Sequence, residues 1–374
     1  MGAKVYQILP RSKRYKYESG LMGKFENFLK DFEVSKYIGE NEVVPLKMHL
    51  GNEGAFKTIR PQFVQKVVER IKHIPAKPFI TDSVRIGGYD YLDVANKAGY
   101  NHLSLGAPII IADGIYGNDS IKVKAGSILG DIAIASAIYD AKSMVVLTHV
   151  KGHIQAVLGG AIKNISMGGV SAQPRGGSWK HGRGKMHFIH GDIMQWDGQK
   201  CTLCLDCMNI CPAECITFPD NVYTVYEKKC FRCGRCARVC PVEAIAVPTT
   251  HENFMKAVAE GAKAVLSTFK KDKVLYINFL LEMQPECDCM PLADTPVAQD
   301  QGILISDDPV AIDMATLDIL ASVTPLPGSV AENLSLENGK DIFTSLYNKD
   351  ARIQLFESEK FNIGSTEYTL EVVE

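Results

Sequence analysis

The chain has 374 residues, 46% of them hydrophobic and 22% charged, which is the composition of a folded soluble protein with a sizeable core. Its 41 lysines and arginines nearly balance 43 acidic residues, and the net charge of −2 gives no overall field that would favour nucleic acid or an anionic membrane. No stretch approaches about 18 uninterrupted apolar residues and no signal-peptide core follows Met1, so we expect a cytoplasmic protein with no nucleic acid and no membrane as partner.

The part of the chain before residue 197 alternates short apolar runs with amphipathic stretches, as is typical of βα units around a mainly parallel sheet. Pro61 suits the first turn of a helix, and an apolar-rich helix is expected to lead directly into the strand that starts at Met144. The predicted strands are 43–48, 78–81, 108–111 and 144–147, and the predicted helices are 61–74 and 128–139.

The same alternation returns after residue 250, with a helix predicted at 252–266 and strands at 274–281 and 303–305. Asp308 has the side chain of a helix N-cap and Pro309 suits the first helical position, so a helix is expected from there to about residue 320. The tail from 353 to 373 is predicted to form a hairpin that turns at 362–364.

Eight cysteines lie between these two parts in two copies of the pattern C-x2-C-x2-C-x3-C-P. This doubled spacing is that of bacterial ferredoxins with two 4Fe-4S clusters. Three closely spaced thiolates wrap one side of a cluster, and the fourth ligand then comes from the other copy. The predicted ligands are Cys201, Cys204, Cys207 and Cys240 for one cluster, and Cys230, Cys233, Cys236 and Cys211 for the other.

Zinc and disulfides are the competing interpretations of these cysteines. Zinc sites use four ligands in separated pairs, which would leave surplus thiols here. Disulfides need a bridge geometry that cysteines three residues apart rarely reach, and they belong to oxidising compartments. The iron-sulfur interpretation therefore explains the repeat best.

The two flanking parts and the cysteine block predict an α/β fold with a mainly parallel sheet and helices on both faces, plus an inserted α+β two-cluster ferredoxin domain. Residues 1–196 and 251–374 would form the α/β domain, with 197–250 as the insert. Insertion into a loop is well tolerated when the ends of the guest lie close together. Three consecutive domains are the alternative, but the C-terminal part has too few strands for a sheet of its own.

Five of the nine histidines lie in one glycine-rich basic segment that begins where the strand at 144–147 ends: His149, His153, His181, His187 and His190. Ligands of open α/β sheets bind at the carboxyl ends of the strands, so this segment predicts a pocket for an anionic ligand or a metal. The candidate catalytic residues are Lys151, His153, Lys163 and His187, with Asn164 beside them. A solvated loop with ordinary polar side chains is the alternative.

Cys287 and Cys289 flank Asp288 just after a predicted strand. Two soft ligands at this spacing could form an extra metal site with His149, or they could be small packing residues. Cys215 takes the place that Ala244 has in the second cysteine copy, so we expect it to pack and not to ligate.

Taken together, the segments resemble the domain of unknown function 362 family, a group of iron-sulfur centre proteins of uncharacterised activity. The resemblance rests on VVPLKMHLG, HVKGHIQAVLGGAIKN, the two cysteine motifs, CDCM and SDDPVAIDMATLD. It implies an α/β domain that carries a 4Fe-4S ferredoxin insert. The loop with Lys151, His153, Lys163 and Asn164 also resembles the corresponding region of nickel-pincer lactate racemase relatives.

These features favour a redox protein of the oxidoreductase type, whose two 4Fe-4S clusters pass electrons between a redox partner protein and a small anionic substrate or metal centre. One alternative is a non-catalytic electron carrier whose α/β domain only docks a partner. Another is a racemase-like enzyme.

Overall fold

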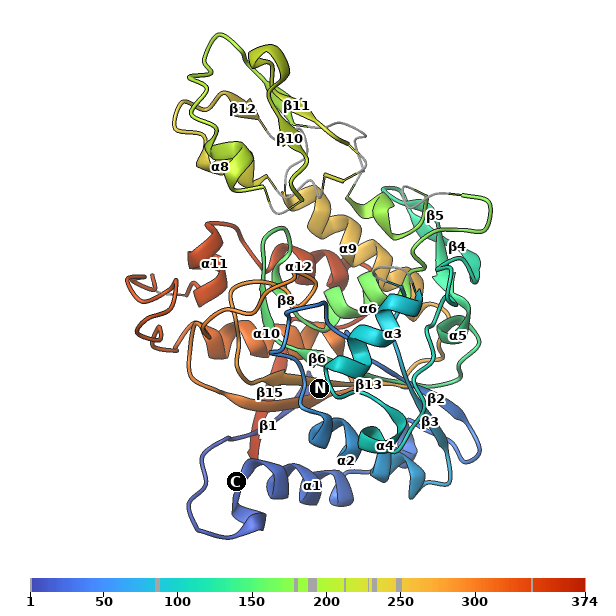
Figure 1. The fold of residues 1–374 in the computed structure, drawn as a ribbon. Helices are drawn as coiled ribbons and strands as arrows, with labels where there is room; N and C mark the ends of the chain where they lie inside the picture. Colours follow the sequence, from blue (N-terminus) through green and yellow to red (C-terminus); the bar gives the residue numbers. More distant parts are fainter. Residues whose placement is uncertain are drawn as a thin grey trace.

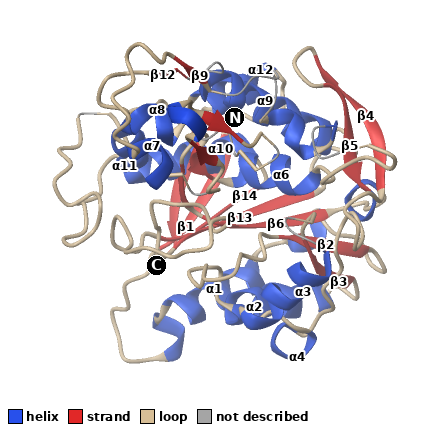
Figure 2. Ribbon diagram, turned by 45° about the horizontal axis from the view of Figure 1, so that its top comes forward, coloured by secondary structure: helices blue, strands red, loops and turns tan. Residues whose placement is uncertain are grey.

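A sheet of seven strands, with helices on both faces, forms the centre of the computed structural model in the part of the chain that it describes (Figures 1 and 2). The described residues are 2–84, 88–177, 181–187, 194–211, 213–227, 229–230, 234–246, 251–337 and 339–373. In sheet order the strands are β15 (Tyr368–Val373), β1 (Ala3–Ile8), β14 (Gly302–Ser306), β13 (Val274–Leu280), β6 (Met144–His149), β2 (Val43–Lys47) and β3 (Lys77–Thr81). Only β14 runs antiparallel to its neighbours, so the predicted α/β class with a mainly parallel sheet is confirmed.

Strands from both sides of the cysteine block pair with each other in this sheet. Strand β13 lies parallel to β6, with Val274 opposite Met144 and Phe279 opposite His149. Strand β14 pairs in turn with β1. The residues before and after the block therefore share one sheet.

The central strands are apolar on both faces because both faces are covered. In β6, Met144 and Val146 belong to one buried cluster, whereas Val145 and Leu147 belong to the other. Successive side chains of a strand point to opposite faces, so a continuous apolar run fits a strand between two helical layers.

The helices divide between these two layers (Figure 2). One face of the sheet carries α1 (Leu21–Asp31), α2 (Pro61–Lys72), α3 (Gly88–Lys97) and α4 (His102–Leu105). The opposite face carries α6 (Ala161–Gly169), α9 (His251–Leu266), α10 (Pro309–Leu320), α11 (Ile342–Tyr347) and α12 (Ile353–Lys360). Among the described residues, no helix has both the length and the apolar character needed to cross a bilayer.

Two hairpins lie outside the sheet. Strand β4 (Ser120–Gly126) pairs with β5 (Gly130–Ala135), which leads into the short helix α5 (Ser136–Tyr139). Strand β7 (Lys151–His153) pairs with β8 (Val157–Gly159) directly after the end of β6. Single turns of 3-10 helix occur at Tyr17–Ser19, Val34–Lys36, Arg183–Met186 and Pro219–Asn221.

The cysteine block forms a small lobe beyond α9 (Figure 1). Each cysteine copy contributes a short helix and a strand, and the lobe has its own apolar cluster around Ile216, Tyr223 and Ile245. Its elements are β9 (Gln195–Trp196), α7 (Asp206–Asn209), β10 (Ile216–Thr217), β11 (Thr224–Val225), α8 (Arg235–Val239) and β12 (Ile245–Ala246), with β9 paired to β12 and β10 to β11.

Two predicted elements are wrong and one is reduced. The segment 128–139 is mostly strand because Ile132 and Ile134 alternate with small residues and pair with β4. The tail is not a hairpin: α12 is followed by β15, which pairs in parallel with β1 at the far end of the chain. The strand expected at 108–111 is a single bridge between Ile80 and Ile109.

The predicted helix start at Asp308 is confirmed, and the same helix supplies a second cap. The Asp308 side chain accepts hydrogen bonds from the backbone N–H groups of Val310 and Ala311. From inside α10, the buried Asp313 accepts from Ala161 at 2.8 Å and Ile162 at 2.9 Å. Asp313 thus caps the N-terminus of α6, where backbone donors otherwise lack partners.

We expect Asp313→Ala to lower the free energy of unfolding by about 3 kcal/mol, because two buried N–H groups of α6 lose their acceptor. Anaerobic urea unfolding followed by circular dichroism measures this loss. Asp318→Ala is the matched control, since Asp318 lies on the same helix and its bonds to Arg352 and Tyr368 are at the surface. Equal losses for both variants would contradict the capping role.

Candidate functional site

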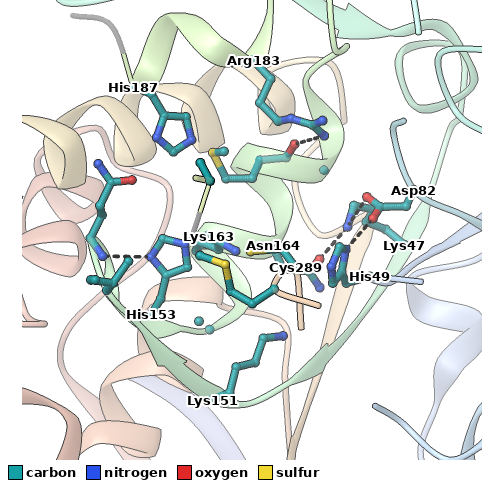
Figure 3. Close-up of a pocket in the computed structure, with 18 of the residues that line it drawn as sticks. Lys47, His49, Asp82, Lys151, His153, Lys163, Asn164, Arg183, His187 and Cys289 are labelled. Atoms are coloured by element: carbon teal, nitrogen blue, oxygen red, sulfur yellow. Dashed lines mark hydrogen bonds and ion pairs between the residues drawn. The ribbon is translucent and has the colours of Figure 1, made fainter. Parts of the chain in front are cut away.

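A cavity of about 430 Å³ lies at the carboxyl ends of β6, β2 and β3 (Figure 3). Lys47 is the last residue of β2, Asp82 directly follows β3, and the segment after β6 forms the hairpin β7–β8 and then α6. Open α/β sheets bind ligands at this edge because the loops and helix N-termini meet there.

The cavity wall is basic. Among the described residues that line it, five side chains are lysine or arginine and a single one, Asp82, is a carboxylate. The cationic lining residues are Lys47, Lys151, Lys163, Arg183 and Lys229, and the histidines are His49, His153 and His187. Such a surface attracts small anions.

The four side chains predicted to converge all line this one cavity. Lys151 and His153 come from β7, Lys163 from α6, and His187 from the turn after residue 186. His181 lies in the described part of the chain but is not among the lining residues, and His190 lies outside the described residues. The glycine-rich segment is therefore a folded wall of the cavity along most of its length.

His153 is held in one orientation. Its Nδ1 accepts hydrogen bonds from the backbone N–H groups of Ala156 at 2.9 Å and Gln155 at 3.2 Å. Its ring stacks on Phe254 of α9, which also contacts His187. Burial lowers the pKa of His153 well below its ordinary value, so the ring is neutral.

Cys287 and Cys289 lie in a tight turn beside His153. The backbone N–H of Met290 bonds to the carbonyl of Cys287 at 2.8 Å, which closes the turn. The two sulfur atoms and a ring nitrogen of His153 all lie within 4.8 Å of one another. This group of soft and nitrogen ligands is a possible metal site.

Lys163 stabilises a thiolate in this turn. Its Nζ lies 3.2 Å from the sulfur of Cys287. A hydrogen bond from Cys289, together with the nearby Lys163 ammonium, lowers the pKa of the Cys287 thiol well below its ordinary value despite burial. Burial alone would lower the pKa of Lys163, but the two cysteines raise it overall.

His149 does not join Cys287 and Cys289 in the extra metal site that the sequence predicted. It was expected beside Cys287 and Cys289, but its Nδ1 lies 3.0 Å from the carboxylate of Asp288 and its Nε2 lies 2.9 Å from the carbonyl of Leu281. The alternation along β7 instead brings His153 to the cysteines.

Asp288 anchors the turn from behind the cavity. It is fully buried and lies 3.0 Å from Lys151 Nζ and 3.1 Å from Gln284 Nε2, in addition to its contact with His149. Burial alone would raise the pKa of Asp288, but His149 and Lys151 lower it below its ordinary value, so the group is ionised.

A second polar network, which we did not predict from the sequence, forms the opposite wall around Asp82. Lys47 Nζ lies 3.1 Å from Asp82 Oδ1, His49 Nδ1 lies 2.9 Å from Oδ2, and the Tyr91 hydroxyl donates to Oδ2 at 2.6 Å. Burial would raise the pKa of Asp82, but Lys47 and His49 lower it below its ordinary value. His49 Nε2 is buried and has no hydrogen-bond partner within the described structure.

The backbone of α6 approaches this network closely. Asn164 accepts from Lys47 at 2.5 Å and donates to the carbonyl of Leu147 at 2.9 Å. Gly168 is required on the same helix, because a Cβ there would lie 2.1 Å from Lys47 and 2.4 Å from Asp82. The sequence contains one signal for this second network, which we missed. Polar residues lie at or directly after the ends of the two apolar strands, in Lys47-Met48-His49 and in Thr81-Asp82-Ser83.

The described cysteines of the two motifs line two separate cavities of the lobe. Cys201, Cys204 and Cys207 surround one together with Cys240 of the second copy. Cys230 and Cys236 surround the other together with Cys211 of the first copy. Cys233 and Pro212 lie outside the described residues. Each cavity thus combines thiols from both copies, and such cysteine-rich stretches have the ligands of a metal centre.

Cys215 is buried in the second of these cavities, with its sulfur 3.5 Å from that of Cys211. Burial raises the pKa of the Cys215 thiol above its ordinary value, so this thiol stays protonated. A protonated, buried thiol is consistent with the predicted packing role.

The lobe meets the main cavity through residues of both cysteine copies. Ala213 from the first copy and Lys229 and Cys230 from the second line the main cavity. Arg235 of α8 forms an ion pair with Glu286, the residue before Cys287. A ligand in the main cavity would therefore lie against both the strand ends and the lobe.

Comparison with known proteins identifies the family. The sequence profile of the domain of unknown function DUF362 matches residues 44–318, which is most of the chain. The chain belongs to the DUF362 family. No curated protein matches this DUF362 chain significantly.

A solved structure that resembles this DUF362 protein is the lactate racemase apoprotein from Thermoanaerobacterium thermosaccharolyticum. The two are 11% identical with a TM-score of 0.31, and the alignment covers 75% of this chain and 51% of the racemase. The DUF362 chain thus spans about half the length of that protein, and likeness at this level assigns no activity.

We expect Lys47→Met to lower the free energy of unfolding by about 3–5 kcal/mol, because it leaves the buried carboxylate of Asp82 without its ammonium partner. The double variant with Asp82→Asn should recover part of this loss, which a double-mutant cycle measures. Lys66→Met, which removes a pair with Glu26 and Glu69 near the surface, should cost less than about 1 kcal/mol. A double variant less stable than either single variant would contradict the pairing.

Proposed function

We propose that this DUF362 protein is a redox protein that holds two 4Fe-4S clusters and passes electrons to a small anionic ligand in the main cavity. The observation that carries the proposal is that Cys230, a predicted cluster ligand, lines the same cavity as Lys163, His153 and Cys289. Bound clusters would supply one-electron chemistry, with a redox partner protein as the source of electrons.

The proposed ligand sets are the crossed ones. Cys201, Cys204, Cys207 and Cys240 would hold one cluster, and Cys230, Cys233, Cys236 and Cys211 the other. The two cavities of the lobe, each lined by cysteines of both copies, support this assignment for the seven described residues.

The lobe at 197–250 is proposed to be an inserted ferredoxin-type domain, with 1–196 and 251–374 as the two parts of the α/β domain. Its separate apolar cluster supports this division, as does the pairing of β6 with β13 across it. The pairing of β9 with β12 brings the two ends of the lobe together, as an insertion requires.

The cavity residues would bind the anion. The ammonium of Lys163 and the guanidinium of Arg183 would neutralise its charge, and His153 would donate a hydrogen bond from Nε2. Asp82 orients the His49 ring through Nδ1, so the unpartnered Nε2 would form a hydrogen bond with the ligand.

We expect anaerobically purified protein to contain about eight iron and eight sulfide atoms per chain, the content of two 4Fe-4S clusters. Cys211→Ala should lower iron to about four and expose the cysteines at 230, 233 and 236, because a cluster shields its ligands from alkylation. Iodoacetamide labelling followed by mass spectrometry identifies the exposed thiols.

Cys240→Ala is the matched variant and should expose Cys201, Cys204 and Cys207 instead. Cys215→Ala places at this position the residue that the second copy has, and it should retain all the iron. Exposure of Cys201, Cys204 and Cys207 in the Cys211 variant would show that each cluster uses one copy alone. Zinc in place of iron would refute the cluster proposal.

We expect malonate, used as a small dianionic probe, to shift the reduction potential of one cluster, because it would bind beside Cys230. Lys163→Met should weaken malonate binding by about tenfold or more and abolish the shift, since it removes an ammonium that lines the cavity. Calorimetry measures binding, and a redox titration followed by electron paramagnetic resonance measures the potential.

Lys185→Met is the control with the same change in net charge, because Lys185 donates to the carbonyl of Asp131 away from the cavity. His153→Ala should weaken binding without loss of iron. If malonate leaves both potentials unchanged, the protein is an electron carrier whose α/β domain only docks a partner.

A further inference from the structure

The turn that contains Cys287 and Cys289 places two cysteines differently with respect to the cavity. Cys289 lines the cavity and is partly exposed, whereas Cys287 lies behind it and is only 2% exposed. The backbone N–H of Cys289 points to the sulfur of Cys287 at 3.4 Å, and the two sulfurs are within 4.8 Å of each other. An accessible sulfur with a buried one behind it is suited to form and break a disulfide.

The surroundings of Cys287 favour a thiolate. Lys163 Nζ, from the half-buried side chain on α6, lies 3.2 Å from the buried sulfur of Cys287. A thiolate held beside an ammonium can accept the proton of the neighbouring Cys289 thiol and so activate that sulfur for thiol–disulfide exchange. Figure 3 shows His153, Lys163 and Cys289 converging on the same part of the cavity.

The orientation of His153 argues against a metal ion between these residues. A metal-binding histidine normally donates its other ring N–H to an acceptor. Here Nδ1 accepts from two backbone N–H groups, so in the neutral ring the proton is on Nε2, the nitrogen that would have to bind the metal. Without His153 the site has two thiols, fewer than the three or four protein ligands that zinc takes.

We propose that Cys287 and Cys289 are a redox-active dithiol that reduces small anionic disulfides entering the cavity. The substrate class follows from the reactive group, which is a thiol pair, and from the wall, which is basic. The proposal rests on the proposed function only for the source of electrons that regenerates the dithiol.

The exchange has two steps. In the first, the sulfur of Cys289 attacks one sulfur of R–S–S–R while the Cys289 proton passes to the Cys287 thiolate, which gives a mixed disulfide and releases RS⁻. Cys287 then loses this proton to RS⁻ and attacks Cys289, which releases a second RS⁻ that takes a proton from water. The substrate gains two electrons and becomes two thiols, and the protein pair becomes a disulfide.

Regeneration takes two electrons and one proton, because the reduced pair consists of one thiol and one thiolate. One-electron carriers of the iron-sulfur class are the reductant, and two clusters that each carry one electron match the demand of one disulfide. Cys230 and Cys289 line the same cavity, so the pair lies on the side of the α/β domain that faces the lobe.

Two disulfide probes of similar length and opposite charge test the proposal. Anaerobically reduced full-length protein is mixed with 3,3′-dithiodipropionate or with cystamine, quenched in acid, alkylated and mapped by mass spectrometry. We expect a disulfide between Cys287 and Cys289 to form about tenfold or more faster with the dianionic probe, because the cavity wall is cationic. Equal rates with both probes would overturn the assignment to anionic disulfides.

Variants distinguish the roles of the two sulfurs. Cys287→Ser should trap a stable mixed disulfide between the probe and Cys289, whereas Cys289→Ser should leave Cys287 unmodified because it is buried. Lys163→Met should slow the reaction by about tenfold, and Lys163→Arg should restore most of the rate. Lys185→Met, the control of equal charge, should react like the unmodified protein.

Metal analysis gives the competing result. One zinc or other single metal ion per chain that is lost in both Cys287→Ser and Cys289→Ser would overturn the dithiol in favour of a metal site. A pair that stays reduced with both probes would overturn it as well.

The outcome is separable from that of the proposed function. Oxidation of the pair by the probe needs no cluster, so it tests the dithiol even if the protein contains no iron. Re-reduction by dithionite, followed by the same mapping, tests the link to the lobe and should be slower in Cys230→Ser. Unchanged re-reduction in that variant would refute electron supply through this cluster while the exchange chemistry stands.

Discussion

The burial of amines at the end of a parallel sheet is the constraint on which the cavity depends. Lys47 and Lys151 are almost fully buried at strand ends, and Lys163 lies beside them on α6. A buried ammonium without a partner is strongly unfavourable. Asp82 and Asp288 supply the opposing charges for the first two amines, and the Cys287 thiolate supplies the opposing charge for the third. Each wall of the cavity is therefore fixed by a specific ion pair, and the basic surface is stable enough to face a ligand.

The sequence was sufficient where structure depends on local pattern. Continuous apolar runs gave β2, β6 and β13 correctly because strands buried on both faces need no alternation. Asp308 and Pro309 gave the start of α10 because capping is a contact between near neighbours. The doubled cysteine spacing predicted a compact lobe for the same reason.

Pairings across long separations could not be predicted in this way. The segment with Ile132 and Ile134 was predicted to be a helix. Its partner strand β4 contains two lysines and has a weak apolar pattern, so the sequence did not reveal the strand pairing. Among the site residues, Lys151, His153, Lys163 and His187 were found from their density in one segment. His49 and Asp82 were missed because they follow different strands and meet only through the order of the sheet. Which of His149 and His153 lies beside Cys287 and Cys289 likewise depends on Asp288, which is 139 residues from His149 in sequence.

The pairing of β15 with β1 has a consequence for how the molecule forms. Tyr368 lies opposite Ala3, and β13 and β14 come from the part of the chain after the lobe, so the sheet is complete only when distant segments have met. Contacts inside the lobe join residues close in sequence, and such contacts form early, whereas pairings between distant strands form slowly. During synthesis the lobe would thus emerge and fold while the strand-end cavity beside it still lacks the turn around Asp288. If the cysteines bind clusters as proposed, the clusters would then be loaded on an open surface, and later closure of the sheet would enclose the site.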